Sequence, residues 1–124
     1  MDRYFEIVDC DKVRGGSNLV IGDIAAGYDE WKKHGFLPKE GIVGHLLGEG
    51  RTFEGSIYIL ECAPGILVPI LPNGVREVSS RVFDSKWQEN MKKGCASQKE
   101  IEKAKSDEMV SSLMNSWGCK EENN

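Results

Sequence analysis

The residues with the clearest potential for chemistry lie between positions 76 and 90, where basic, aromatic and amide side chains follow one another closely. They are Arg76, Arg81, Phe83, Trp87 and Asn90. An arginine guanidinium offers a fixed fork of donors to a phosphate, and an aromatic face stacks on a base. An asparagine amide can pair with the edge of adenine. This segment therefore predicts a binding pocket for a nucleotide that carries a diphosphate.

Two further arginines, Arg14 and Arg51, lie in glycine-bearing loops that could close over such a pocket. Gly15 and Gly16 follow Arg14, and three glycines surround Arg51 within residues 48–55. Functional loops often have this composition, but an ordinary hairpin tip has it as well. In the alternative interpretation, the two aromatic rings belong to the hydrophobic core and the arginines are simply solvated.

The sequence marks no catalytic centre. His34 and His45 have no nucleophile elbow beside them, and the carboxylates are spread along the chain as solvated charges. The cysteines never form the close ligand pairs that zinc sites usually show. They are Cys10, Cys62, Cys95 and Cys119. We therefore expect a binding protein rather than an enzyme, with no metal and no cofactor, and with reduced cysteines that are mostly buried.

The charge balance limits the partners that the chain can bind. There are 16 basic and 20 acidic residues, and the net charge is −4 at pH 7. No overall field draws such a chain to nucleic acid or to an anionic membrane. No run approaches the ~18 apolar residues of a membrane span, and the N-terminal residues do not resemble a signal peptide. We expect a cytoplasmic protein whose partner is a small molecule.

The elements that must position these residues begin with a run of apolar strands. Residues 57–62, 66–71 and 75–78 are rich in β-branched side chains and are separated by two Pro/Gly turns, which predicts a β-meander. Pro69 indicates an edge or a bulge in the second run. Residues 4–10 and 19–21 are expected to pair as a hairpin, and residues 41–47 to form another strand before a loose loop over 48–55.

These patterns predict an α+β fold in a single domain, residues 1–124. We divide it into a β-rich part (1–83), a helical part (84–118) and a frayed tail (119–124). The β-rich part is expected to hold an antiparallel sheet of five to six short strands, which can curl into a partly closed barrel. It also holds one small helix from Asp23 to about residue 34, ended by Gly35.

Two C-terminal helices complete the predicted layout. A capping box of Ser85 and Gln88 opens a helix over 86–93, and a second box, Ser97 with Glu100, opens a helix to about Trp117. The second helix carries an apolar stripe. The stripe consists of Ile101, Ala104, Val110, Leu113, Met114 and Trp117. The two helices together also carry Trp87, Met91, Met109, Met114 and Trp117. This surplus apolar surface predicts a homodimer through the C-terminal helices, with packing on the chain's own sheet as the alternative.

In this layout the chain resembles the phage proteins that act as sponges for cyclic ADP-ribose and so counter the first described type of Thoeris defence. The resemblance spans the whole chain and matches the roles of Phe83 as a stacking residue, Asn90 as an amide and the arginines as diphosphate ligands. It implies a homodimer with ligand pockets at its interface. Such a protein would sequester a cyclic nucleotide or ADP-ribose-type signal without degrading it, in the host cytosol if it is phage-encoded.

A different class of protein also fits part of the chain. Residues 41–83, with short strands and glycine-rich loops, resemble the small β-barrels of KOW and Tudor type. This resemblance implies an interaction module that binds a protein or RNA. RNA binding would call for a more positive charge balance, so nucleic acid is the less favoured partner of the two.

Overall fold

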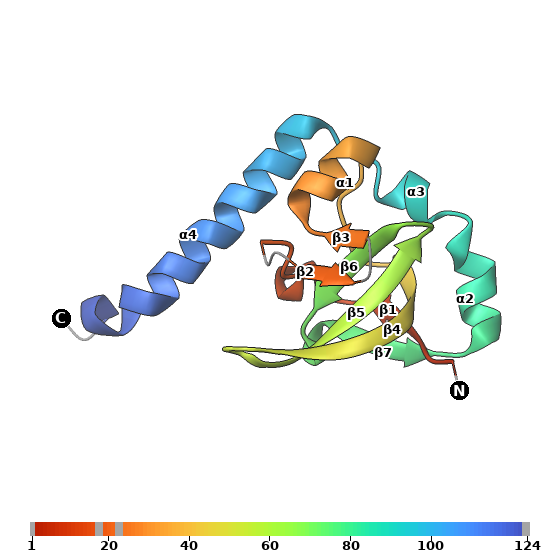
Figure 1. Ribbon diagram of the computed structural model, residues 1–124, viewed down its shortest axis with the longest axis horizontal. Helices are drawn as coiled ribbons and strands as arrows, with labels where there is room; N and C mark the ends of the chain where they lie inside the picture. Colours follow the sequence, from red (N-terminus) through yellow and green to blue (C-terminus); the bar gives the residue numbers. More distant parts are fainter. Residues whose placement is uncertain (1, 17–18, 22–23, 123–124) are drawn as a thin grey trace.

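A five-stranded antiparallel sheet, with the strand order β6-β5-β4-β1-β7, is the centre of the fold (Figure 1). The computed structural model describes residues 2–16, 19–21 and 24–122. The sheet strands are β1 (Tyr4–Ile7), β4 (Val43–Thr52), β5 (Gly55–Ala63), β6 (Ile66–Ile70) and β7 (Val75–Val78). Because the helices pack beside an antiparallel sheet, the chain has an α+β fold, as the sequence predicted. The sheet is not a closed barrel, because its outer strands β6 and β7 do not pair with each other.

The predicted meander is confirmed for its first two runs, β5 and β6, which pair with each other, and β4 adds a neighbouring strand on the other side of β5. The third run of the predicted meander, β7, lies elsewhere. A short 3-10 helix, η2 (Pro72–Gly74), precedes it, and β7 then pairs with β1 on the far side of the sheet. The predicted loop over 48–55 is also wrong. Residues 48–52 continue β4, because their backbone pairs with β5 and needs no apolar side chains to do so.

The first strand, β1, lies inside the sheet between β4 and the edge strand β7. The predicted hairpin of residues 4–10 with 19–21 is therefore wrong. Instead, β2 (Leu19–Ile21) pairs with β3 (Ile24–Ala26) in a separate two-stranded ribbon. Another 3-10 helix, η1 (Cys10–Lys12), leads away from β1. In the described residues the main sheet thus has five strands, within the five to six predicted, and the ribbon of β2 and β3 is separate from it.

The small helix α1 (Tyr28–His34) begins later than predicted, because residues 24–26 form β3. Its predicted cap, Asp23, lies outside the described residues. Its end is as predicted. Gly35 has φ 63°, a left-handed conformation that glycine adopts without strain, and its N–H group donates to the carbonyl of Lys32.

The hydrophobic core lies between one face of the sheet and α1. Phe5 and Ile7 point into it from β1, and Leu60 and Val68 from β5 and β6. Trp31 of α1 is fully buried in the same core and donates its indole N–H to the carbonyl of Leu67 at 2.9 Å. This is the anchoring role that a buried tryptophan with a satisfied N–H group is expected to have.

Three helices follow the sheet: α2 (Ser80–Trp87), α3 (Asn90–Lys93) and α4 (Gln98–Glu122). The predicted box of Ser85 and Gln88 is wrong, because the cap of α2 is Ser79, whose hydroxyl accepts from the N–H of Val82 at 3.2 Å. The helical part thus begins earlier than residue 84, and the predicted single helix over 86–93 is divided into two.

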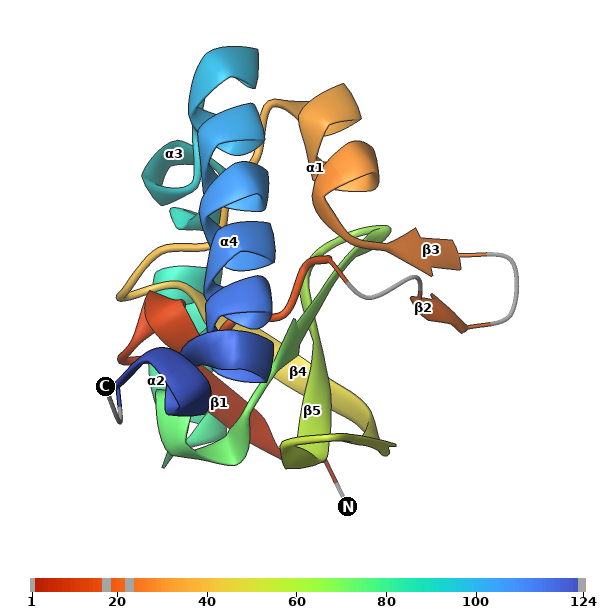
Figure 2. The ribbon, with the colours of Figure 1, turned by 90° about the vertical axis from the view of Figure 1, so that its left-hand side faces the viewer.

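The predicted box at the start of α4 is confirmed. The hydroxyl of Ser97 accepts from the N–H of Glu100 at 3.2 Å. The helix runs to Glu122, so most of the tail expected to be frayed is helical. Its first turns lie beside α1 in both views (Figures 1 and 2), and Figure 1 shows its C-terminal half extending away from the sheet. No helix in the described part of the chain has both the length and the apolar character to cross a membrane.

Candidate ligand-binding site

Four half-buried aromatic side chains form a continuous row on the face of the sheet opposite to the core. We call Tyr4, His45, Phe83 and Trp87 the aromatic row. The ring centroids are 5.3 Å apart for Tyr4 and His45, 4.4 Å for Tyr4 and Phe83, and 4.8 Å for Phe83 and Trp87. Each member keeps part of its surface in contact with solvent. Such a row offers aromatic surface on which a planar ligand can stack.

Strand and helix periodicity together build the aromatic row. Successive side chains of a strand point to opposite faces, so Tyr4 points away from the core that contains Phe5. His45 lies directly opposite Tyr4 on β4. Phe83 and Trp87 are four residues apart on α2 and therefore share one face of that helix. The helix lies against β1 and β4, which brings the two pairs of rings together.

The polar partner of His45 belongs to the first residues of the chain. The Nε2–H group of His45 donates to the Oδ1 atom of Asp2 at 3.1 Å. This contact fixes the plane of the imidazole ring at the end of the aromatic row.

A carboxylate with two cations lies next to the aromatic row. Glu6, two residues after Tyr4, has only 8% of its surface exposed. Lys86 Nζ donates to it at 2.9 Å and Arg76 Nη2 at 2.6 Å. The hydrogen bond from Lys86 lowers the pKa of Glu6, and the bond from Arg76 adds to this effect against the cost of burial. The Arg76 side chain remains 66% exposed, so the cation lies at the surface beside the rings.

Of the five residues predicted between positions 76 and 90, the structure brings three together. Phe83 and Trp87 belong to the aromatic row, and Arg76 lies beside it. Arg81 precedes Phe83 by two residues, which corresponds to about 200° around a helix. Its exposed side chain therefore leaves α2 on the opposite side from the rings.

Asn90 lies inside the protein, with 1% of its surface exposed. Its amide group donates to the carbonyls of Val43 (2.6 Å) and Cys62 (2.7 Å), and its oxygen accepts from the N–H of Val43 at 3.1 Å. The side chain thus joins the backbones of β4 and β5, and its hydrogen-bonding groups are occupied by the protein.

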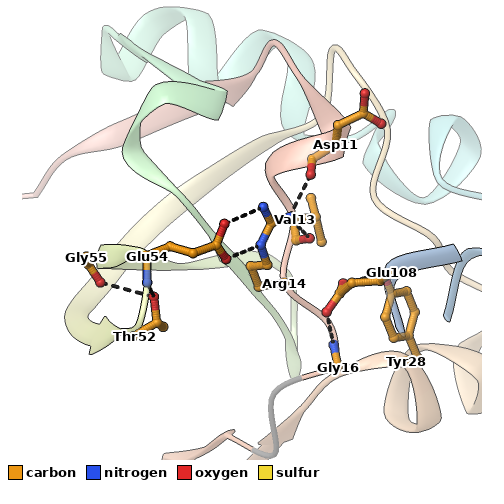
Figure 3. A network of polar contacts seen from close by, with 9 residues as sticks. All are labelled: Asp11, Val13, Arg14, Gly16, Tyr28, Thr52, Glu54, Gly55 and Glu108. Carbon is orange, nitrogen blue, oxygen red and sulfur yellow. Dashed lines mark hydrogen bonds and ion pairs between the residues drawn. The ribbon is translucent and has the colours of Figure 1, made fainter. Parts of the chain in front are cut away.

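Arg14 and Arg51 lie at the other end of the β4–β5 hairpin. Arg14 forms a bidentate ion pair with Glu54 at 2.6 and 2.9 Å and also donates to the carbonyls of Asp11 and Val13 (Figure 3). The hydrogen bond from Arg14 lowers the pKa of the Glu54 carboxyl. His45 and Arg51 are six positions apart on β4, which corresponds to ~20 Å of extended chain. The structure therefore does not bring Arg14 and Arg51 to the aromatic row.

The glycines after Arg14 serve the packing of the chain. A Cβ atom on Gly15 would lie 2.5 Å from the ring of Trp31, so no larger residue fits there without displacing that ring. The N–H group of Gly16 donates to Glu108 Oε2 at 3.0 Å, and Tyr28 donates its hydroxyl to Glu108 Oε1 at 2.7 Å (Figure 3). The carboxylate of Glu108 thus already occupies the place that an anionic ligand would take at Gly16.

The cysteines differ in their surroundings. Burial and the neighbouring Glu40 raise the pKa of Cys10 to about 12, and burial raises the pKa of Cys62 as well. Both thiols are therefore protonated at neutral pH and are poor nucleophiles. Cys95 is exposed, contrary to the expectation of mostly buried cysteines. The side chain of Cys119 lies outside the described residues. Elsewhere in the described part of the chain, no group of acidic, histidine and cysteine side chains could hold a metal ion.

Sequence reasoning missed Tyr4, Glu6 and His45. The alternation in β1 marks Tyr4 and Glu6 as outward-facing, which is a signal that the sequence does carry. Nothing local indicates that β1 pairs with β4 and lies under α2. The composition of the aromatic row therefore depends on contacts between distant segments.

Comparisons with protein-family models, with curated proteins and with solved structures found no match to this chain. Any function assigned to it has to come from its own residues.

Proposed function

We propose that the protein binds and sequesters a cyclic nucleotide or an ADP-ribose-type signalling molecule in the cytoplasm, without catalysing its conversion. The observation that carries this proposal is the aromatic row, in which four rings contact one another and remain partly open to solvent. Stacking of a base on an aromatic side chain contributes about 1–3 kcal/mol. The base of the ligand stacks on this row.

The charges beside the aromatic row suit an anionic ligand. Arg76 is 66% exposed and uses Nη2 to bind Glu6, while much of its guanidinium faces solvent. Lys86 binds the other oxygen of Glu6 at 2.9 Å and is 36% exposed. One carboxylate thus faces two cations, so these three side chains together carry one net positive charge. A phosphate group next to a stacked base would meet that charge.

Capture rather than turnover agrees with the state of the reactive groups. The thiols of Cys10 and Cys62 are protonated because burial raises their pKa. Glu6 is engaged by two cations and is therefore a poor general base. Tight binding without conversion lowers the free concentration of a signal below the level that its receptor needs.

The first test is a thermal-shift screen of the purified chain against cyclic ADP-ribose isomers, cyclic di- and trinucleotides and short RNA. A large shift with one nucleotide, which is recovered unchanged by mass spectrometry after heat release, supports sequestration. A nucleotide that returns cleaved would make the protein an enzyme. A shift with RNA alone would assign it to the interaction modules, and no shift with any compound would overturn the proposal.

A variant at the end of the aromatic row tests the position of the site. Trp87→Ala should weaken binding of the identified ligand by about 5- to 150-fold, which corresponds to the loss of one stacking partner. Isothermal titration calorimetry measures this loss. Lys92→Ala, an exposed change away from the rings, is the matched control. Equal affinities of the two variants would place the ligand elsewhere.

The proposal includes assembly as a homodimer, for which the sequence favours the C-terminal helices. On α4, Met109 and Val110 are exposed at 56% and 58%. The side chains of Leu113, Met114 and Trp117 lie outside the described residues. Met109 and Val110 are therefore the described apolar residues of this helix at which an association along α4 can be tested against other interfaces.

A further inference from the structure

The hairpin of β4 and β5 has one unpaired edge. β1 pairs with β4 only at residues 43–45, and the carbonyl of Arg3 accepts from the N–H of Leu46 at 2.9 Å just beyond them. From Leu47 onward, β4 pairs with β5 alone, and within the described residues no strand lies along its other side. Figure 1 shows this end of the hairpin extending beyond the rest of the sheet.

The register of the hairpin shows which backbone groups face this free edge. Thr52 pairs with Gly55 across the two-residue turn of Phe53 and Glu54. Backbone groups of an antiparallel strand point alternately toward one neighbour and the other. The backbone N–H and C=O groups of Thr52 point toward β5, because Thr52 pairs with Gly55 across the turn. The backbone N–H and C=O groups of Glu49 and Arg51 therefore point toward the free edge. They are donors and acceptors ready to pair with another strand.

The side chains along this edge are complementary to themselves. If two copies of β4 are placed antiparallel about Gly50, Glu49 of one copy lies opposite Arg51 of the other, and this pair occurs twice. A shift of the register by two residues would instead place Glu49 opposite Glu49, or Arg51 opposite Arg51. Charge therefore favours one register over its neighbours.

We propose that the free edge of β4 joins two copies of this chain in an antiparallel, two-fold symmetric pairing centred on Gly50. Each hydrogen-bonded pair of an antiparallel ladder exchanges two bonds, so the two Glu49–Arg51 pairs supply about four main-chain hydrogen bonds between the copies. The pairing is isologous, because each copy contributes the same residues. This inference does not depend on the ligand proposed above.

Two features of the hairpin favour a second copy as the occupant of this edge. The bidentate ion pair of Arg14 with Glu54 holds the hairpin tip against η1, so little further ordering is needed on association (Figure 3). Natural proteins often protect long edges with proline or lysine. Residues 47–52 contain neither, and their two charged side chains have opposite signs. A strand that carries a single kind of charge would form one attractive and one repulsive pair with this edge, whereas a second copy of the edge forms two attractive pairs.

Charge reversal tests both the interface and its register. Sedimentation velocity over a wide concentration range should show a monomer–dimer equilibrium for the native chain. Glu49→Arg and Arg51→Glu each create like-charge pairs and should weaken the dimer about tenfold or more. The double variant carrying both changes should restore it. A mixture of the two single variants should form a heterodimer, because both cross-strand pairs between the two different copies then join an arginine to a glutamate.

The same experiment distinguishes the β4 edge from α4. Met109→Glu should leave the dimer unchanged if β4 forms it. A dimer that is lost in Met109→Glu and kept in both charge-reversal variants would assign the interface to α4 and overturn this inference. A chain that stays monomeric at every concentration would overturn it as well. Hydrogen exchange gives a second readout, because the amides of Glu49 and Arg51 should gain protection as the protein concentration rises.

Discussion

Glu6 is the charged side chain that the described part of the fold buries most deeply, and it joins three segments of the chain. It lies in β1, and its two oxygens bind Arg76 of β7 and Lys86 of α2. These cations lower the pKa of the Glu6 carboxyl below its reference value of 4.5. Because its pKa is lower in the folded state, ionised Glu6 stabilises the fold above pH 4.5. This contribution is lost as the pH falls through the folded-state pKa.

Replacement of Glu6 should therefore have a pH-dependent effect. Glu6→Gln should lower the free energy of unfolding by about 1–3 kcal/mol at pH 7, because hydrogen bonds to a charged group are lost. Urea denaturation followed by circular dichroism measures this difference. Below pH 4.5 the difference from the native protein should shrink, since both side chains become neutral. A difference that stays constant from pH 7 to acid would show that the charge of Glu6 does not stabilise the fold.

Asn90 shows where residue-level reasoning from the sequence fails. Its amide was predicted to bind a ligand on the assumption of one continuous helix over 86–93. The structure divides this segment into α2 and α3, and Asn90 begins the second helix, where it turns inward to β4 and β5. Phe83 and Trp87 share a face because both lie within α2. The helix break therefore explains why Asn90 was placed beside Trp87 in error, while Phe83, which was expected at the end of the sheet, lies with Trp87 on α2.

At the scale of elements, α4 is attached to the rest of the protein by polar contacts with α1 and with Gly16. Glu108 binds the N–H of Gly16 and the hydroxyl of Tyr28, and Lys105 pairs with Asp29 at 3.1 Å. Burial, together with the hydrogen bond to Glu108, raises the pKa of Tyr28, so its hydroxyl stays protonated. Ile101 adds a buried apolar contact at the start of the helix.

Loss of the Glu108 contacts should loosen this part of α4. Glu108→Ala removes two hydrogen bonds, one of them from a buried tyrosine, and should lower the free energy of unfolding by about 1–3 kcal/mol. Amide hydrogen exchange should become faster in residues 102–110. Ser106→Ala, an exposed change on the same helix, should leave this exchange nearly unchanged. If Glu108→Ala behaves like this control, the carboxylate does not hold the helix.

The elements that the sequence predicted well are those with local causes. The turn at Gly65, the end of α1 at Gly35 and the capping box at Ser97 all depend on residues a few positions apart. The strand over 48–52 was missed because its glycines and charges are typical of a loop. Its pairing with β5 supplies backbone hydrogen bonds that no local pattern of side chains predicts.

At the scale of the whole molecule, the α+β class was predictable, while the arrangement of the sheet was not. The number of apolar runs and the two helical segments determine the class. The position of β1 between β4 and β7 requires contacts between segments far apart in the sequence. The aromatic row depends on the same contacts. The sequence therefore indicated Phe83 and Trp87 but not Tyr4 and His45.

The position of β1 between two strands that follow it much later in the chain also has a consequence for the order of folding. Its partners lie at residues 43–45 and 75–78, so β1 must close long loops before it can pair, whereas β4, β5 and β6 pair through short turns. We expect Leu60→Ala to slow refolding with a φ-value above about 0.5, and Phe5→Leu mainly to speed unfolding with a φ-value below about 0.3. Stopped-flow kinetics in urea measures both, and equal φ-values would contradict this order. If the expected values are found, the strand that comes first in the chain is among the last to reach its native place.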